Sequence, residues 1–304
     1  MRRCLSALVL FALAGLAAAG AGAQDRSGSV IFAGARGILE LNLATRELSV
    51  LVPSVVATSF PTMRGGTPES HQTRPMPMQI HHSVVAVDDN RFLFTERREQ
   101  DAIKEFDRRT GSAKRLHAGH VAAYLPGVQQ ILFFTLRADG SGHQLETAEL
   151  DNIQNTRRIL LAGPVYADGT KLIAISPSEV VVQRKPKQLT TYDLANGNQQ
   201  ELTNPNCDRL VLWDAEASRL LCLSYGGSGY RYMWTDLDGK HVQEHARPAG
   251  FTPLLCVDQC GAMLGYKTRI TSAGEVNDIW LAKSGGTGEV LLERLTPFSP
   301  VLMR

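Results

Sequence analysis

Histidine and arginine side chains in the first half of the chain have the clearest potential for chemistry. Six of the eight histidines lie between residues 71 and 143. Neutral imidazole is a common ligand of zinc, copper or nickel. Two nearby arginines can hold an anionic group by charge-assisted hydrogen bonds. The ligand-binding candidates are Arg64, His71, Arg74, His82, His120 and His143.

A metal site is one interpretation of the histidines, with His82, His120 and His143 as its candidate ligands. His81 and His82 are adjacent in an expected strand, so their side chains point to opposite faces and only one can join a shared site. No His-Glu-x-x-His or His-x-Glu string accompanies them. Ordinary loop and strand histidines are therefore the other interpretation, and the sequence identifies no cofactor.

Short apolar runs, broken every few residues by Gly, Asp, Asn or Pro, make up most of the chain. Ser29–Ala33, Phe92–Thr95 and Ile131–Leu136 are examples. Such runs are typical of strands separated by turns. No stretch of about 11 residues or more keeps a helical period. The sequence therefore predicts an all-β protein.

One unit of a strand, a polar residue, a turn and a second strand recurs along the chain. Its turn-start position recurs at intervals of 42 to 46 residues, after a first interval of 65 residues. A repeat of about 40–45 residues that holds four short strands is typical of a β-propeller blade. The six turn-start residues, and hence six predicted blades, are Asn42, Asp107, Glu149, Asp193, Asp236 and Ala282.

The repeated Asp and Asn residues are interpreted as turn formers. Their side chains accept hydrogen bonds from the backbone just ahead of them, and a following Gly tolerates a positive φ. Side-chain bonding of this kind is ordinary for Asp and Asn in turns. Recurrence alone therefore does not make Asp107, Asp193 or Asp236 a catalytic carboxylate.

The first blade lacks an innermost strand. Its strands are Ser29–Ala33, Gly37–Leu43 and Leu48–Val52, whereas each later blade has four. The segment near Val301 looks like a further inner strand, and we expect it to pair beside Val30. Closure of this kind removes the exposed sheet edges. The predicted fold is a six-bladed β-propeller whose C-terminal segment supplies the inner strand of blade one.

An insertion of residues 53–78 accounts for the long first interval. It contains Pro53, Pro61, Pro68, Pro75 and Pro77, so it is too rich in proline for a strand pair. It connects blade one to the centre of blade two, on the face where the candidate histidines gather. Long loops are functional lids or linkers. Two interpretations stay open, a loop that covers a partner and a mobile linker.

Three segments resemble blades of TolB-like, or WD40-like, β-propellers. They are Ile131–Gly140, Leu220–Gly229 together with Tyr232–Gly239, and Asp278–Leu281. The resemblance covers five or six blades and implies the propeller fold, but it implies little about function, because propellers host binding and catalysis alike. TolB-like proteins carry a separate domain before the propeller. In this chain the first strand follows closely on residues 1–23, so we expect residues 24–304 to form one propeller domain.

Residues 1–23 predict a cleavable secretory signal. Arg2 and Arg3 precede an apolar run that ends in small residues. An uncleaved anchor is the alternative, whereas lipidation is disfavoured because Cys4 precedes the run. The segment holds two of the 32 basic and none of the 30 acidic residues, so the mature chain is neutral, which argues against nucleic-acid binding. We expect a periplasmic or secreted protein with no transmembrane segment after cleavage.

Four cysteines follow the signal and allow three pairings. Cys256 and Cys260 flank one tight turn, so we expect them to form a disulfide. Cys207 and Cys222 lie in the equivalent hairpin of the preceding blade with an apparent offset, and their pairing stays open. A metal site of all four is disfavoured because paired short knuckles are missing.

No sequence motif indicates an enzyme. The string Gly226–Tyr230 lacks the residue between Ser and Gly that a nucleophile elbow requires. Gly285–Gly288 lacks the Lys of a phosphate-binding loop. We therefore expect a non-enzymatic exported module that binds a protein or cell-envelope ligand over the insertion-bearing face. The alternative is a metal-dependent enzyme, a lyase or hydrolase of a saccharide or acidic polymer, with the histidines as ligands.

Overall fold

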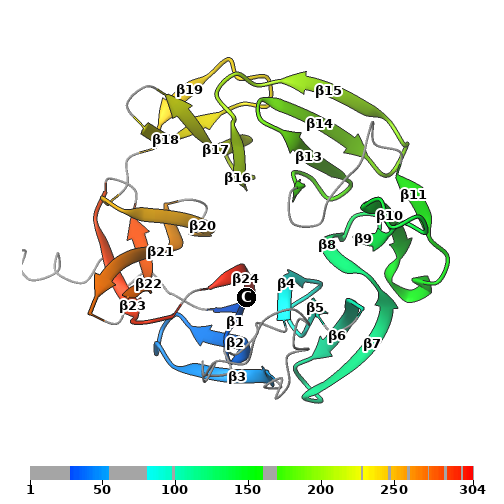
Figure 1. Cartoon of the computed structure of the whole chain (residues 1–304), viewed down its shortest axis with the longest axis horizontal. Coiled ribbons are helices and arrows are strands. Elements are labelled where there is room, and N and C mark those ends of the chain that lie inside the picture. The colour runs from blue at the N-terminus through cyan, green and yellow to red at the C-terminus, as the bar shows by residue number, and fades with distance from the viewer. Residues whose placement is uncertain are drawn as a thin grey trace, which may run out of the picture.

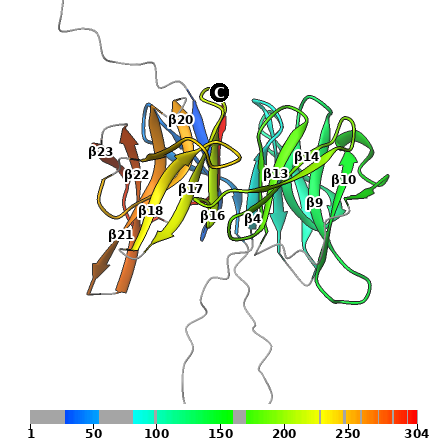
Figure 2. The same cartoon turned by 90° about the horizontal axis from the view of Figure 1, so that it is seen from above.

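The computed structural model describes residues 28–54, 81–97, 100–159, 170–226, 229–245, 248–258, 261–272, 274–283, 286–295 and 297–303. Within these ranges the chain forms six four-stranded antiparallel sheets, arranged as blades around a central axis (Figure 1). Figure 2 views the ring from the side, with strands running between its two faces. The ranges contain no helix with the length and apolar character of a membrane span. The fold is the predicted six-bladed β-propeller.

The first three blades each run from an inner strand at the centre of the ring to an outer strand at its rim. Blade one contains, in this order, β24 (Phe298–Met303), β1 (Ser29–Gly34), β2 (Gly37–Asn42) and β3 (Leu48–Pro53). Blade two contains β4 (His81–Ala86), β5 (Arg91–Glu96), β6 (Ala102–Asp107) and β7 (Ser112–Ala118). Blade three contains β8 (His120–Leu125), β9 (Gln130–Leu136), β10 (His143–Glu149) and β11 (Arg157–Ile159), and a short 3₁₀ helix, η1 (Leu150–Asn152), precedes β11.

The remaining three blades repeat this order. Blade four contains β12 (Lys171–Ala174), β13 (Glu179–Lys185), β14 (Gln188–Asp193) and β15 (Gln199–Thr203). Blade five contains β16 (Arg209–Asp214), β17 (Arg219–Gly226), β18 (Gly229–Thr235) and β19 (Val242–Glu244). Blade six contains β20 (Phe251–Asp258), β21 (Ala262–Thr271), β22 (Gly274–Lys283) and β23 (Gly288–Leu292).

The second strand of a blade is the most apolar because neighbouring blades cover both of its faces. All six residues of β1 are buried, and so are five of the six in β5. The core is divided into six clusters, one between each pair of neighbouring blades. Between blades one and two, for example, Ile31 packs with Phe92 and Phe94. Such two-sided burial accounts for the continuous apolar runs in the sequence.

The ring is closed by the C-terminal strand, as predicted. β24 pairs antiparallel with β1, with Ser29 opposite Met303 and Val30 opposite Leu302. Met303 is buried in the cluster between blades one and two. Blade one is therefore assembled from both ends of the described chain.

The repeated polar residues are turn formers. Oδ1 of Asn42 accepts hydrogen bonds from the backbone N–H groups of Ala44 and Thr45, both at 2.9 Å. Asp107 and Asp193 each accept one from the N–H two residues later. These bonds satisfy backbone donors that the tight turn leaves without strand partners. The prediction of a local structural role is confirmed.

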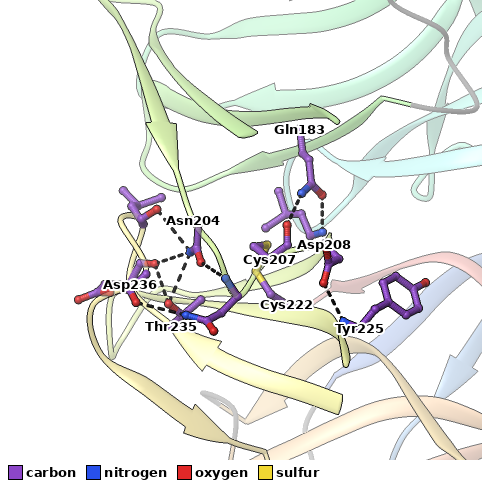
Figure 3. The surroundings of a disulfide bond; sticks show 12 residues. Gln183, Asn204, Cys207, Asp208, Cys222, Tyr225, Thr235 and Asp236 are labelled. Atoms are coloured by element: carbon purple, nitrogen blue, oxygen red, sulfur yellow. Dashed lines mark hydrogen bonds between the residues drawn. A yellow bond between two sulfur atoms is a disulfide. The ribbon is translucent and has the colours of Figure 1, made fainter. Parts of the chain in front are cut away.

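A disulfide joins Cys207, which precedes β16, to Cys222 in β17, with a Cα–Cα distance of 4.9 Å (Figure 3). This pairing, which the sequence left open, ties the start of the inner strand to its neighbour. Cys256 is disulfide-bonded as well. Its predicted partner Cys260 lies outside the described residues, so that pairing stays a prediction.

Candidate functional site

The inner strands bring polar residues together at one end of the ring. We call this end the insertion face, defined as the face on which β3 ends and β4 begins. Residues at or near the start of all six inner strands line a central cavity of about 480 Å³. Because every blade repeats the same strand order, the first residues of β8, β12 and β16 meet at this face although they are far apart in sequence.

Bulges in the inner strands aim extra residues at the central cavity. Near their starts, β4, β8, β16 and β20 each contain a register shift that leaves one residue unpaired with the second strand. A bulge of this kind bends the strand and redirects a side chain. The unpaired residues all line the cavity and are Ser83, Ala122, Val211 and Leu254.

Two cations, Lys171 and Arg209, stand in the wall of the central cavity. No carboxylate is among the described residues that line it, and neither cation has an ion-pair partner within the described part of the chain. Lys171 is exposed to solvent, although protein atoms crowd around its side chain. The desolvation that this crowding causes, together with repulsion from Arg209, lowers the pKa of Lys171. The cavity therefore favours an anion, which would neutralise both groups.

A side pocket of about 650 Å³ lies on the same face, between blades two and three. It brings together the two predicted residues His120 and His143, which come from different connections. His117, the last polar residue before β8, joins them. Nδ1 of His143 is buried and has no hydrogen-bond partner among the described residues. The other charged residues of the pocket are Arg97, Asp101 and Glu146.

His120 lines both the side pocket and the central cavity. Its Nε2 is 2.6 Å from Oγ of Ser83, and its Nδ1 is 3.6 Å from Oδ2 of Asp101. Only 14% of the His120 side chain and 29% of the Asp101 side chain are exposed. Ser83 belongs to β4, Asp101 to the connection between β5 and β6, and His120 to the start of β8. Three segments thus position one imidazole between a hydroxyl and a carboxylate.

The structure places only part of the predicted ligand-binding set. His120 and His143 line the side pocket. Arg64, His71 and Arg74 lie outside the described residues. The backbone of His82 is in β4, opposite Thr95, and its side chain is not described.

A metal site finds no support among the described side chains. No three His, Cys, Asp or Glu residues within the described ranges lie close enough to hold a metal ion. Of the three candidate ligands, His120 already contacts Ser83 and Asp101. The side chain of His82 lies outside the described part, so the full set of three stays a prediction.

Sequence reasoning missed Ser83, Asp101, Lys171 and Arg209. Each looks in the sequence like an ordinary polar residue in a strand or next to one. Alignment of the six inner strands at their first residue was the signal that could have placed Lys171 and Arg209 with His120. No comparable signal marked Asp101, because it lies between strands.

No known protein family and no curated protein matches the sequence. Solved structures with the same fold do match. TolB from Acinetobacter baumannii superposes with a TM-score of 0.60 at 12% identity, over 92% of this chain and 67% of that chain. A chain of a nidogen–laminin complex gives 0.60 at 13% identity, over 91% and 98%. A putative TolB from Agrobacterium tumefaciens gives 0.54 at 10% identity, over 88% of each chain. The chain therefore has a TolB-like β-propeller fold.

Proposed function

We propose that this chain is an exported binding propeller that takes an anionic group of a protein or cell-envelope ligand into its central cavity, from the insertion face. The observation that carries the proposal is the pair Lys171 and Arg209, which share a cavity without a carboxylate among its described lining residues. The solved structures with a similar fold support the propeller architecture but do not indicate the ligand. The chemistry of the ligand is therefore inferred from this cavity.

The chemistry of the cavity favours an anion over a cation or a neutral group. Arg209 offers several N–H donors and Lys171 offers a second positive charge, and both form charge-assisted hydrogen bonds with carboxylate or phosphate oxygens. Water in the cavity is confined by protein, so screening is weaker there than on an open surface. A bound anion would also relieve the repulsion between the two cations.

Residues 53–78 extend this site in the proposal. β3 ends at Pro53 and β4 begins at His81, both on the face where the cavity opens. Arg64, His71 and Arg74 belong to the insertion and would add positive charge or hydrogen bonds around the ligand. The segment then acts as a partner-covering loop rather than a linker.

The bonded cysteines are consistent with an oxidising compartment. Cys207 and Cys222 form a disulfide, and such bonds persist in the periplasm and outside the cell. Together with the predicted signal at residues 1–23, this supports a periplasmic or secreted protein.

Binding to two anionic probes tests the proposal. Purified residues 24–304 are titrated with fluorescein-labelled hexaglutamate and, separately, with vesicles that contain phosphatidylglycerol. A protein ligand is favoured if the peptide binds, and an envelope ligand if the vesicles bind. We expect substitution of both Lys171 and Arg209 by Met to weaken binding by about tenfold or more. Added salt should weaken it as well.

Two further variants separate the cavity from general surface charge. Arg157→Gln with Arg158→Gln removes two exposed charges from β11 and should leave binding unchanged. Deletion of residues 58–73 should weaken binding if the insertion covers the ligand. Equal binding of both probes to the wild type and to the Lys171 and Arg209 variant contradicts the proposal.

A further inference from the structure

The contact of His120 with Ser83 and Asp101 has the order of groups that activates a serine. One ring nitrogen, Nε2, faces the hydroxyl, and the other, Nδ1, faces the carboxylate. In this order the imidazole can accept the proton of the serine while the carboxylate orients the ring and stabilises its positive charge. The Ser83 contact of 2.6 Å is a full hydrogen bond. The Asp101 separation of 3.6 Å needs to shorten by about 0.5 Å to become one.

Ser83 is held in a strained backbone conformation beside the central cavity. It is the bulge residue of β4 and has a φ of +46°, which an L-amino acid rarely adopts. The fold does not require a hydroxyl there, because Ala122, Val211 and Leu254 occupy the bulges of three other inner strands. The strained conformation and the histidine contact therefore point to a role for this hydroxyl.

Ser299 provides an internal comparison. It lies in the irregular region of β24, on another inner strand, and also has a φ of +46°. Ser299 is exposed, whereas Ser83 is only partly exposed. Among the described residues, only Ser83 of these two serines contacts a histidine. The two serines thus share a backbone conformation and differ in the neighbouring base.

We propose that Ser83, His120 and Asp101 form a nucleophilic site that hydrolyses small esters at the insertion face of the ring. Ser83 and His120 are the catalytic residues, and Asp101 is a positioning residue. The inference goes beyond ligand binding, and beyond the sequence-based expectation of a non-enzymatic protein. It requires no metal and no co-reactant other than water.

The reaction proceeds in two steps. Oγ of Ser83 forms a bond to the ester carbonyl carbon, its proton moves to Nε2 of His120, and the carbonyl π electrons move to the oxygen. The intermediate collapses, the C–O bond to the alcohol breaks, and the alcohol leaves with the proton from His120. In the second step, water attacks the acyl carbon and gives a proton to Nε2 of His120. The bond between the acyl carbon and Oγ of Ser83 then breaks, the carboxylic acid leaves, and His120 returns the proton to Oγ.

The central cavity narrows the class of ester. Lys171 and Arg209 line the same cavity as Ser83, so they can stabilise the negative oxygen of the intermediate. They also favour an ester whose acyl part carries a carboxylate. This preference rests on the proposed binding function, whereas the reactivity of Ser83 does not.

Covalent labelling with a neutral alkyl fluorophosphonate tests the nucleophile. Oγ of Ser83 should attack phosphorus and displace fluoride, while His120 takes the proton. For folded residues 24–304 we expect one adduct per chain, located on Ser83 by peptide mapping. Ser83→Ala should abolish labelling. His120→Gln, which keeps a hydrogen-bonding side chain, should slow it by about 10²-fold or more.

Matched variants separate activation from accessibility. Ser299→Ala should label at the wild-type rate, since no histidine contact marks that serine in the described structure. Far-UV circular dichroism and a thermal melt check the fold of each variant, and His120→Gln provides the test should Ser83→Ala unfold. The proposal is overturned if the folded wild type carries no adduct on Ser83. Equal labelling of the folded His120→Gln variant overturns it as well.

Asp101 is tested by a kinetic comparison with p-nitrophenyl acetate. Asp101→Asn should lower kcat by about tenfold or more and leave KM unchanged, because the residue acts through His120. Asp101→Glu should restore part of kcat. Unchanged kcat in the folded Asp101→Asn variant removes Asp101 from the site.

A charged ester separates this inference from the binding proposal. Mono-p-nitrophenyl succinate carries a carboxylate in its acyl part, and we expect its KM to be about tenfold lower than that of the acetate. Lys171→Met should remove the difference. Labelling of Ser83 with equal KM for both esters would uphold the nucleophile and contradict the anion site. Binding of the anionic probes without labelling of Ser83 would uphold the anion site and contradict the nucleophile.

Discussion

Blade one and blade five hold their inner strands in different ways. In blade one, β24 comes from the other end of the chain and is attached to β1 by strand pairing. In blade five, the Cys207–Cys222 disulfide joins the start of β16 to β17 within one hairpin. The first attachment is noncovalent and joins distant residues. The second is covalent and local.

Blade five has a second local attachment through buried amides (Figure 3). Gln183 of blade four donates to the carbonyl of Cys207 and accepts from the N–H of Leu210. Asn204, which is fully buried, donates to the carbonyl of Asp236. The comparison teaches that the pairing of β1 with β24 determines whether the ring is closed. The contacts in blade five instead stabilise one blade of a ring that is already closed.

Deletion of residues 298–304 is expected to have the largest effect. It removes β24, with buried Met303 and partly buried Val301 and Leu302. Lost burial of about 1.5–3 kcal/mol for each apolar side chain predicts a loss of roughly 5 kcal/mol, measured by calorimetry. Deletion of Arg304 alone is the control. An unchanged Tm for the longer deletion would count against closure by β24.

Substitution of both Cys207 and Cys222 by Ala should be less damaging. The bond spans 15 residues, for which the entropic contribution is about 3 kcal/mol. Urea unfolding of the variant and of the wild type, each with and without reductant, measures the loss. Reductant should affect the wild type more than the variant. A variant as stable as the oxidised wild type would show that blade five does not depend on this bond.

The predicted Cys256–Cys260 disulfide should contribute less, because its loop is shorter. A contribution on the order of 1–3 kcal/mol is expected, and strain can reduce it. Peptide mapping under non-reducing conditions checks the pairing directly. Two free thiols at these positions would rule the bond out.

Gln183→Ala should cost about 1–3 kcal/mol, because it leaves the N–H of Leu210 buried without its partner. Gln188→Ala, at an exposed position on β14, is the matched control and should have almost no effect. Urea unfolding measures both. Equal stabilities for the two variants would mean that the amide does not link blades four and five.

The smallest expected effect is the contribution of Asp236 to the pH dependence of stability. Partial burial alone would raise its pKa, but hydrogen bonds from the His241 N–H and ring and from the Lys240 N–H outweigh it and lower the pKa to about 2. Because the folded pKa is below the unfolded value, the stabilisation is present above about pH 4 and is lost as the pH falls towards 2. Solvent screening keeps it under about 1 kcal/mol. Asp236→Asn should flatten the acid limb of the stability curve, and an unchanged limb would contradict this.

The sequence predicted the fold because each blade repeats local physical requirements. Asn42, Asp107 and Asp193 start turns with side-chain hydrogen bonds, and the apolar second strands follow from burial on both faces. The C-terminal closure was predictable for a similar reason, since blade one lacked an inner strand. These features depend on neighbours in sequence or on a count of strands.

The candidate site was predicted only in part. His120 and His143 were placed on one face because strand order fixes where connections lie. Ser83, His120 and Asp101 meet across three segments and follow no motif, so their contact depends on the packing of blade two against blade three. The sequence also left the pairing of Cys207 with Cys222 open, because the two residues seemed offset in their hairpin. Cys207 precedes β16, and the chain curls back there through the hydrogen bond from its N–H to the carbonyl of Asn204.

Pairing of Ser29 with Met303 also sets the order of events during folding. The first sheet cannot be completed until residues 298–303 have been synthesised, so blade one stays incomplete while the other five blades are made. Contacts between such distant residues form slowly, because a long loop must close before any of them stabilises the fold. Late closure thus gives the C-terminal strand a role in timing as well as in stability.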